Sequence, residues 1–133
     1  MALKITDCEV GGVAVLTLEG RIMLGEETVR FREKVNEVVT ARKKKIVLNL
    51  KNVTMIDSSG LGALLTARFT AQSSGATLCL CNLGSRTNEL LQMTRLVTVF
   101  EVFNSEADAV LAMLPPYLLY SELSLKERES GHL

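Results

Sequence analysis

The part of this chain best suited to chemistry is a short polar and glycine-rich run that follows an apolar stretch. It reads Asp57-Ser58-Ser59-Gly60-Leu61-Gly62. The apolar stretch predicts a strand and the run predicts the start of a helix, with Asp57 or Ser58 as its N-cap. Two adjacent hydroxyls then lie at a helix N-terminus, where free backbone N–H groups and the helix dipole favour an anion. The pattern fits a functional site and a well-capped strand-to-helix junction equally well.

No catalytic set accompanies the two serines. A nucleophilic serine needs a general base, usually histidine, and the one histidine, His132, lies in a predicted tail. The spacing of the glycines matches neither GxSxG nor the phosphate-binding GxxxxGK[ST] pattern. Asp57 and Ser58 alone offer too few oxygens to hold a metal ion. We therefore predict that the protein is not an enzyme and that it has no cofactor and no metal site.

The three cysteines do not form a disulfide framework. Cys8 stands alone, while Cys79 and Cys81 are two residues apart and would share one face of a strand. A metal or redox pair would more often show CxxC spacing. The prediction is that Cys79 and Cys81 are small side chains packed in the core.

Composition indicates one neutral domain. The 133 residues are 47% hydrophobic and carry 15 basic and 15 acidic side chains. No global field draws the chain to nucleic acid or to an anionic membrane, so neither is an expected partner. No apolar run reaches the ~18–20 residues of a membrane-spanning helix, and the N-terminus lacks a secretory h-region. We expect a cytoplasmic protein.

The hydrophobic pattern alternates between strands and helices. Strands are predicted over residues 3–10, 13–18, 46–50, 76–81 and 97–102. Four helices are predicted. The first covers residues 26–42, and the second runs from Leu61 through Phe69 to near Gly75. The third follows a Ser85 cap and carries Leu90, Leu91 and Met93, and the fourth follows a Ser105 cap. The basic run of residues 42–45 is expected to close the first helix, as its dipole favours. The order ββαβαβαβα predicts an α/β domain whose opening hairpin is antiparallel and whose later strands are parallel.

A pair of prolines, Pro115 and Pro116, should end the last helix. We expect a domain over residues 1–114 and a C-terminal extension over 115–133 that is helical or partly disordered. Residues 117–123 are mildly amphipathic, so the extension is expected to pack on the domain or on a neighbouring chain.

The central motif resembles the signature of STAS domains, and most closely that of bacterial anti-sigma factor antagonists. The resemblance is carried by residues 46–50, Val53 and the run from Met55 to Gly62. It extends from a Gly20-Arg21-Ile22 turn to residues 90–96 and covers about residues 4–114. It implies the STAS fold, a mixed sheet of four to five strands flanked by about four helices.

The resemblance also implies a regulatory role for the serine directly after the aspartate, which is Ser58. In this family a partner serine kinase of the GHKL type, often itself the anti-sigma factor, phosphorylates that residue. The unphosphorylated protein would bind the kinase and so release a sigma factor. Phosphorylation would break this complex, and a phosphatase would remove the phosphate and restore binding. The partner-binding residues implied are Met23, Asp57, Ser58, Ser59, Gly60 and Leu61.

Met23 departs from the family pattern. Members commonly carry an aspartate two residues after the position of Arg21, near the phosphorylated serine. Glu26 and Glu27 are close enough in sequence to compensate. The alternative hypothesis is a non-catalytic STAS scaffold or accessory subunit, of the stressosome or lipid-transport kind, that forms homodimers or larger assemblies through its C-terminal extension.

Overall fold

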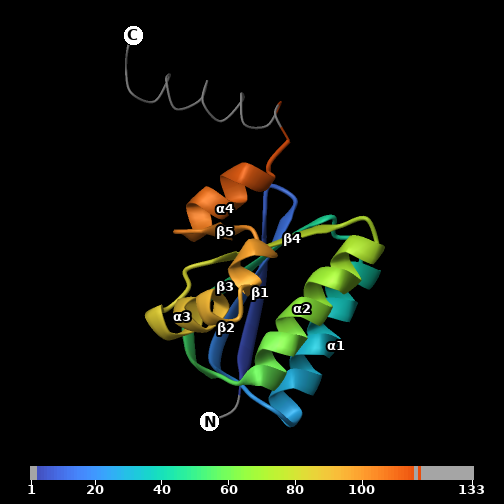
Figure 1. Ribbon diagram of the computed structural model, residues 1–133. Coiled ribbons are helices and arrows are strands. Elements are labelled where there is room, and N and C mark those ends of the chain that lie inside the picture. The colour runs from blue at the N-terminus through green and yellow to red at the C-terminus, as the bar shows by residue number, and fades with distance from the viewer. Residues whose placement is uncertain (1–2, 116, 118–133) are drawn as a thin grey trace.

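The protein is a single five-stranded sheet with helices on both faces (Figure 1). The computed structural model describes residues 3–115 and residue 117. The strands are β1 (Lys4–Val10), β2 (Val13–Ile22), β3 (Lys45–Ile56), β4 (Thr77–Cys81) and β5 (Val102–Phe103). The helices are α1 (Glu26–Thr40), α2 (Ser58–Ser73), α3 (Ser85–Met93) and α4 (Glu106–Met113), with a short 3₁₀ turn η1 (Leu96–Thr98).

The strands lie in the sheet in the order in which they occur along the chain. β1 pairs with β2 in the antiparallel direction, whereas β2, β3, β4 and β5 are parallel. Parallel neighbours require a crossover, and α1, α2 and α3 supply the crossovers between them. The predicted element order and mixed sheet are therefore confirmed, with β3 at the centre.

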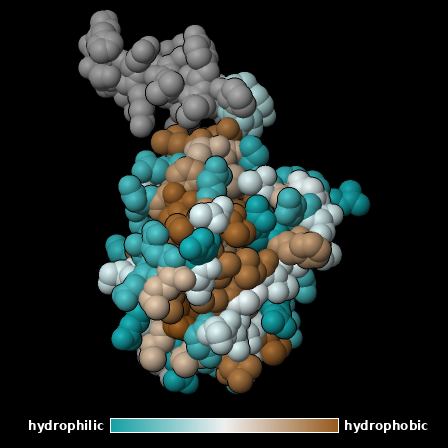
Figure 2. All heavy atoms as spheres, in the orientation of Figure 1, coloured by the Kyte–Doolittle hydropathy of each residue, from teal (hydrophilic) through white to brown (hydrophobic). Residues whose placement is uncertain are grey.

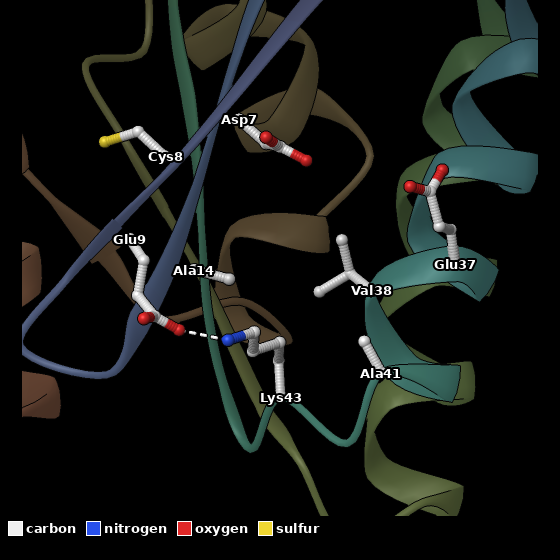
Figure 3. Close-up of a pocket in the computed structure, with 8 residues that line it drawn as sticks. All are labelled: Asp7, Cys8, Glu9, Ala14, Glu37, Val38, Ala41 and Lys43. Carbon is white, nitrogen blue, oxygen red and sulfur yellow. Dashed lines mark hydrogen bonds and ion pairs between the residues drawn. The ribbon is translucent and has the colours of Figure 1, made fainter.

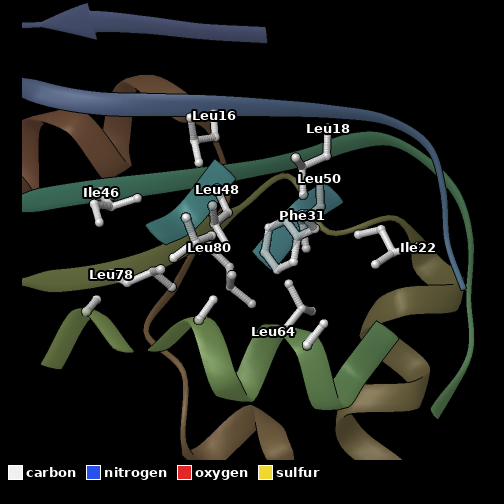
Figure 4. Packing of buried hydrophobic residues seen from close by; sticks show 14 of the residues in the cluster. Leu16, Leu18, Ile22, Phe31, Ile46, Leu48, Leu50, Leu64, Leu78 and Leu80 are labelled. Carbon is white, nitrogen blue, oxygen red and sulfur yellow. The ribbon is translucent and has the colours of Figure 1, made fainter. Parts of the chain in front are cut away.

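Alternation along the strands divides the core into two layers. Leu16, Leu48 and Leu80 are neighbours in the register of β2, β3 and β4, and they point to the face covered by α1 and α2. Phe31 of α1 and Leu64 of α2 fill the middle of this larger layer (Figure 4). The large apolar residues here are almost wholly excluded from water, so this face carries most of the hydrophobic stabilisation.

The second layer is smaller and lies under α4. Val15, Val47 and Cys79 are register neighbours on this face, and Val110 and Met113 of α4 pack over it. Cys81 belongs to the same layer, so the prediction that Cys79 and Cys81 are core residues is confirmed. Burial raises the pKa of Cys79 to about 12 and that of Cys81 to about 11, which keeps both thiols protonated.

The strand predicted over residues 97–102 was wrong over most of its length. Residues Leu96–Thr98 form η1 after Arg95 turns the chain through a left-handed conformation, φ 64°. Only Val102 and Phe103 pair with the end of β4. The β-branched run at residues 97–99 has strand propensity, but it has no neighbouring strand to pair with.

The basic run does not close α1. The helix ends at Thr40, Arg42 adopts a left-handed turn with φ 63°, and Lys45 already begins β3. The lysines of the run instead tie elements together. Lys43 forms an ion pair with Glu9 of β1, and the Lys44 Nζ donates a hydrogen bond to the Ser74 carbonyl at 3.0 Å.

Three smaller expectations also changed. Gly84, not Ser85, is the N-cap of α3, and it makes no side-chain cap bond. Phe69, expected on the buried side of α2, is 69% exposed. The Gly20-Arg21-Ile22 segment is part of β2, not a turn. The Ser105 cap is confirmed, because its Oγ accepts a hydrogen bond from the Asp108 N–H at 3.1 Å.

Among the described residues, none of the helices is long and apolar enough to cross a membrane. The predicted extension lies outside the described residues except for Pro115 and Tyr117.

Candidate functional site

The site begins where β2 and β3 end together. The register pairs Ile22 with Ile56, the last residues of the two strands. Two irregularities in this pairing, one after Thr17 and one after Gly20, each give β3 one more residue than β2. The loop that follows β2 therefore lies directly beside the turn that leads from β3 into α2.

Asp57 joins these two connections. Its Oδ1 accepts a hydrogen bond from the Gly60 N–H at 2.8 Å, which makes Asp57 the N-cap of α2. Its Oδ2 accepts a second bond from the Leu24 N–H at 3.0 Å, 33 residues away in sequence. The Leu24 and Gly60 N–H groups hold the pKa of Asp57 below its usual range, so the carboxylate stays charged. One side chain thus fixes the helix start against the neighbouring loop.

Gly60 allows the first turn of α2 to approach the end of β2. A Cβ at this position would lie 2.0 Å from the Ile22 carbonyl oxygen and 2.6 Å from a side-chain carbon of Ile56. The clashing oxygen belongs to the backbone and cannot swing aside. Glycine is needed here for close packing, which explains one of the two glycines in the motif; Gly62 has open space around it.

The helix start presents Ser58 to solvent. Ser58 is the first residue of α2 and is exposed, whereas Ser59 is half-buried. Met23 is half-buried in the loop after β2, and the adjacent Leu24 is 76% exposed. The structure therefore brings Met23, Asp57, Ser58 and Ser59 together at the carboxyl ends of β2 and β3.

The two remaining predicted contact residues have a different place. Leu61 is only 7% exposed and packs in the larger core layer, and Gly60 is buried against β2. Neither offers a side chain to a partner surface. Both hold the helix start in position.

The acidic residues near Met23 differ in role. Glu27 is directed toward Arg21 at the end of β2, with a carboxylate oxygen 3.4 Å from the guanidinium Nε. Glu26 is exposed in the first turn of α1. The Glu27 carboxylate is thus engaged within the domain, which leaves Glu26 as the acid of this turn that faces solvent.

A pocket of about 170 Å³ lies elsewhere, between β1 and the C-terminal end of α1 (Figure 3). Asp7 and Glu9 point toward α1, and an ion pair joins two of the lining residues, Lys43 and Glu9. Cys8 points to the other side of β1. In the part of the chain that the structure describes, no group of three or more metal-ligating side chains occurs. We assign this pocket no part in the site around Ser58.

A second hollow lies next to the candidate site and was not predicted from the sequence. It has a volume of about 250 Å³ and is lined by Met55, Ile56, Arg86, Glu89, Leu90 and Met93. The sequence predicted a short helix that carries Leu90, Leu91 and Met93, but it did not show that Met93 is 73% exposed or that Met55, 46% exposed, lines the same hollow. The two methionines could have indicated a binding surface, but they are 38 residues apart in the sequence, so no local pattern brings them together.

Comparison with known proteins supports a family assignment. A family model described as the STAS domain matches residues 4–109. The anti-sigma F factor antagonist of Paenibacillus polymyxa is 28% identical over 100 residues, which covers 74% of this chain and 85% of the relative.

Solved structures agree with the fold. An anti-sigma factor antagonist from Mycobacterium paratuberculosis superposes with a TM-score of 0.71 at 20% identity, covering 84% of this chain and 93% of the other. The Bacillus protein SpoIIAA in its unphosphorylated form gives a TM-score of 0.63 at 15% identity, with 84% and 96% covered. Its phosphorylated form gives the same TM-score at 18% identity, with 82% and 96% covered. Together with the match over residues 4–109, the sheet order and the helix start at Asp57 place this chain in the STAS domain family.

Proposed function

We propose that this protein is an anti-sigma factor antagonist whose binding to an anti-sigma serine kinase is controlled by phosphate on Ser58. The observation that carries the proposal is the exposure of Ser58 at the N-terminus of α2, directly beside the Asp57 carboxylate. The unphosphorylated surface of Met23, Asp57, Ser58 and Ser59 binds the kinase, of the GHKL type, and so releases a sigma factor. A serine phosphatase reverses the modification. The protein acts by binding and not by catalysis.

The switch works through charge at the contact surface. Phosphate adds about −1.5 to −2 charges at pH 7. Within the domain this charge is tolerated at a helix N-terminus. Against a partner surface fitted to a neutral hydroxyl, the phosphate must give up its water, and its repulsion with the neighbouring Asp57 carboxylate grows as water is excluded from the interface. Every ~1.4 kcal/mol lost weakens binding tenfold, so a few such increments abolish the complex without refolding the antagonist.

Relatives support this role. A curated relative is an anti-sigma F factor antagonist, and SpoIIAA, which shares the fold, is described in both unphosphorylated and phosphorylated forms. The aspartate, serine and glycine that define the helix start here are the residues on which the resemblance rests.

Phosphorylation is tested directly. The purified protein is incubated with ATP and the purified anti-sigma factor kinase of its source organism, and the modified residue is mapped by mass spectrometry. We expect one phosphate, on Ser58. Phosphate on Ser59 or elsewhere, or none while a positive-control substrate is labelled, contradicts the assignment.

Binding is tested with matched variants at neighbouring hydroxyls. Ser58→Ala should keep the affinity of the wild type for the kinase, and Ser58→Asp should lose at least tenfold, as measured by biolayer interferometry. Ser59→Asp places the same charge one residue away on a half-buried side chain and serves as the control for position. Equal binding by Ser58→Ala and Ser58→Asp rules out the charge mechanism.

A STAS scaffold or accessory subunit is the second candidate. It is favoured by apolar side chains exposed at the end of the sheet opposite Ser58, where Val10 is 42% and Leu111 43% exposed. These residues lie beside the point where the chain leaves α4, and a surface there can bind another copy. The oligomeric state distinguishes this role from the simple switch.

A further inference from the structure

A partner that reads Ser58 must cover much more surface than one serine. A stable protein–protein interface buries about 800 Å² on each partner, equivalent to a patch of roughly 16 Å radius. Met55 is three residues before Ser58, so its Cα lies within about 11 Å of the Ser58 Cα even if the chain between them is fully extended. The Met55 side of the hollow is therefore near enough to Ser58 for one partner surface to contact both.

This hollow has the composition of a binding pocket for an apolar side chain. Met55 and Ile56 come from the last residues of β3, and Leu90 and Met93 come from α3, the helix beside that strand end (Figure 1). Apolar side chains gather between α3 and α2 on the face shown in Figure 2. Methionine adapts its shape to the group it contacts and is frequent at binding surfaces. The ~250 Å³ volume is enough for one large side chain.

The rim of the hollow carries opposite charges. Arg86 and Glu89 lie on the exposed side of α3, one turn apart, and in the described part of the chain neither forms an ion pair. A partner group that enters the hollow meets apolar side chains and, from α3, one positive and one negative side chain. Such a rim favours a partner surface whose own charges are complementary to Arg86 and Glu89 beside its apolar anchor.

We propose that the hollow formed by Met55, Ile56, Leu90 and Met93 receives a large apolar side chain of the same kinase that binds at Ser58. The inference rests on the function proposed above. In this proposal the hollow and Ser58 make different contributions to the interface. The hollow supplies affinity in both phosphorylation states, because its contacts are apolar, and Ser58 supplies the response to phosphate.

The test uses the full chain and the purified anti-sigma factor kinase in the binding assay already described. Truncation of a central apolar anchor commonly weakens a complex about tenfold or more. Met93→Ala and Met55→Ala should each weaken binding by about that factor. Leu111→Ala is the matched control, since it removes a similarly exposed apolar side chain from α4, and its affinity should stay within twofold of wild type. Circular dichroism and thermal unfolding confirm that all three variants are folded.

The outcomes separate the two proposals. If wild type binds and Ser58→Asp does not, but Met93→Ala and Met55→Ala bind like wild type, the switch stands and the hollow is not part of the interface. If both methionine variants weaken binding while Ser58→Asp binds like wild type, the hollow stands and the charge switch falls. If wild type does not bind the kinase at all, both are overturned.

Discussion

At the scale of single residues, Asp57 does more for this site than cap a helix. Its two carboxylate oxygens accept hydrogen bonds from two connections, one at Gly60 in its own helix start and one at Leu24, which is 33 residues from Asp57 in the sequence. Ser58 is thereby held on a rigid helix start instead of a free loop. The precision of the switch proposed above, which depends on one hydroxyl, rests on this neighbouring carboxylate.

We predict that Asp57→Asn destabilises the fold by about 1 kcal/mol at pH 7, because an amide cannot accept from both N–H groups. The effect depends on pH. The pKa of Asp57 is lowered in the folded state, so its charged form stabilises the fold above the ordinary value of 3.8, and this contribution is lost as pH falls through the folded-state pKa. Urea unfolding of both proteins from pH 7 to pH 2 measures the difference. It should shrink toward zero at the acid end, and a difference independent of pH would show that charge is not the cause.

At the scale of secondary structure, the two glycines of the motif should respond in opposite directions. Gly60→Ala forces a Cβ against the Ile22 carbonyl oxygen and should cost about 1–3 kcal/mol or more. Gly62→Ala meets nothing within 4 Å and should stabilise α2 by up to about 1 kcal/mol, since alanine favours a helix over glycine.

Thermal unfolding of the two variants measures both effects on one helix. Because the substitutions are chemically identical and only two residues apart, each is the control for the other. A similar shift in the same direction would mean that the close approach of α2 to β2 is not rigid.

Element by element, the predictable part of the fold is the part determined by local periodicity. The strands over residues 13–18 and 76–81, the central strand at Ile46–Leu50 and the Ser105 cap depend on neighbouring residues, and these predictions were confirmed. The placement of residues 97–99 was not predictable, because a run with strand propensity forms a strand only where a partner strand exists.

The candidate site divides in the same way. Asp57 as cap and Ser58 at the helix start follow from the motif itself. The bond from Leu24 to Asp57 and the placement of Met55 and Met93 around one hollow are long-range, and no local pattern encodes them. Leu61 was expected at the partner surface because it belongs to the motif, but helical geometry turns it into the core.

At the scale of the whole molecule, the segment after α4 can be tested for a role in folding and in assembly. We predict that a chain ending at Leu114 keeps its fold, since α4 already covers the second core layer and Leu114 is the C-cap of that helix. Light scattering of this shortened chain and of the full chain gives their masses. An unchanged monomer or dimer agrees with the simple switch, whereas a large assembly that collapses on truncation favours the scaffold.

The edges of the sheet have a consequence for the behaviour of the protein at high concentration. β1 exposes its charged residues Lys4, Asp7 and Glu9, which form ion pairs with Glu19, Lys34 and Lys43, and β5 at the other edge is only two residues long. A strand from another molecule finds a charged template at one edge and almost no template at the other. The sheet is thus protected against edge-to-edge aggregation, so the protein can accumulate to high concentration without its strands joining those of its neighbours.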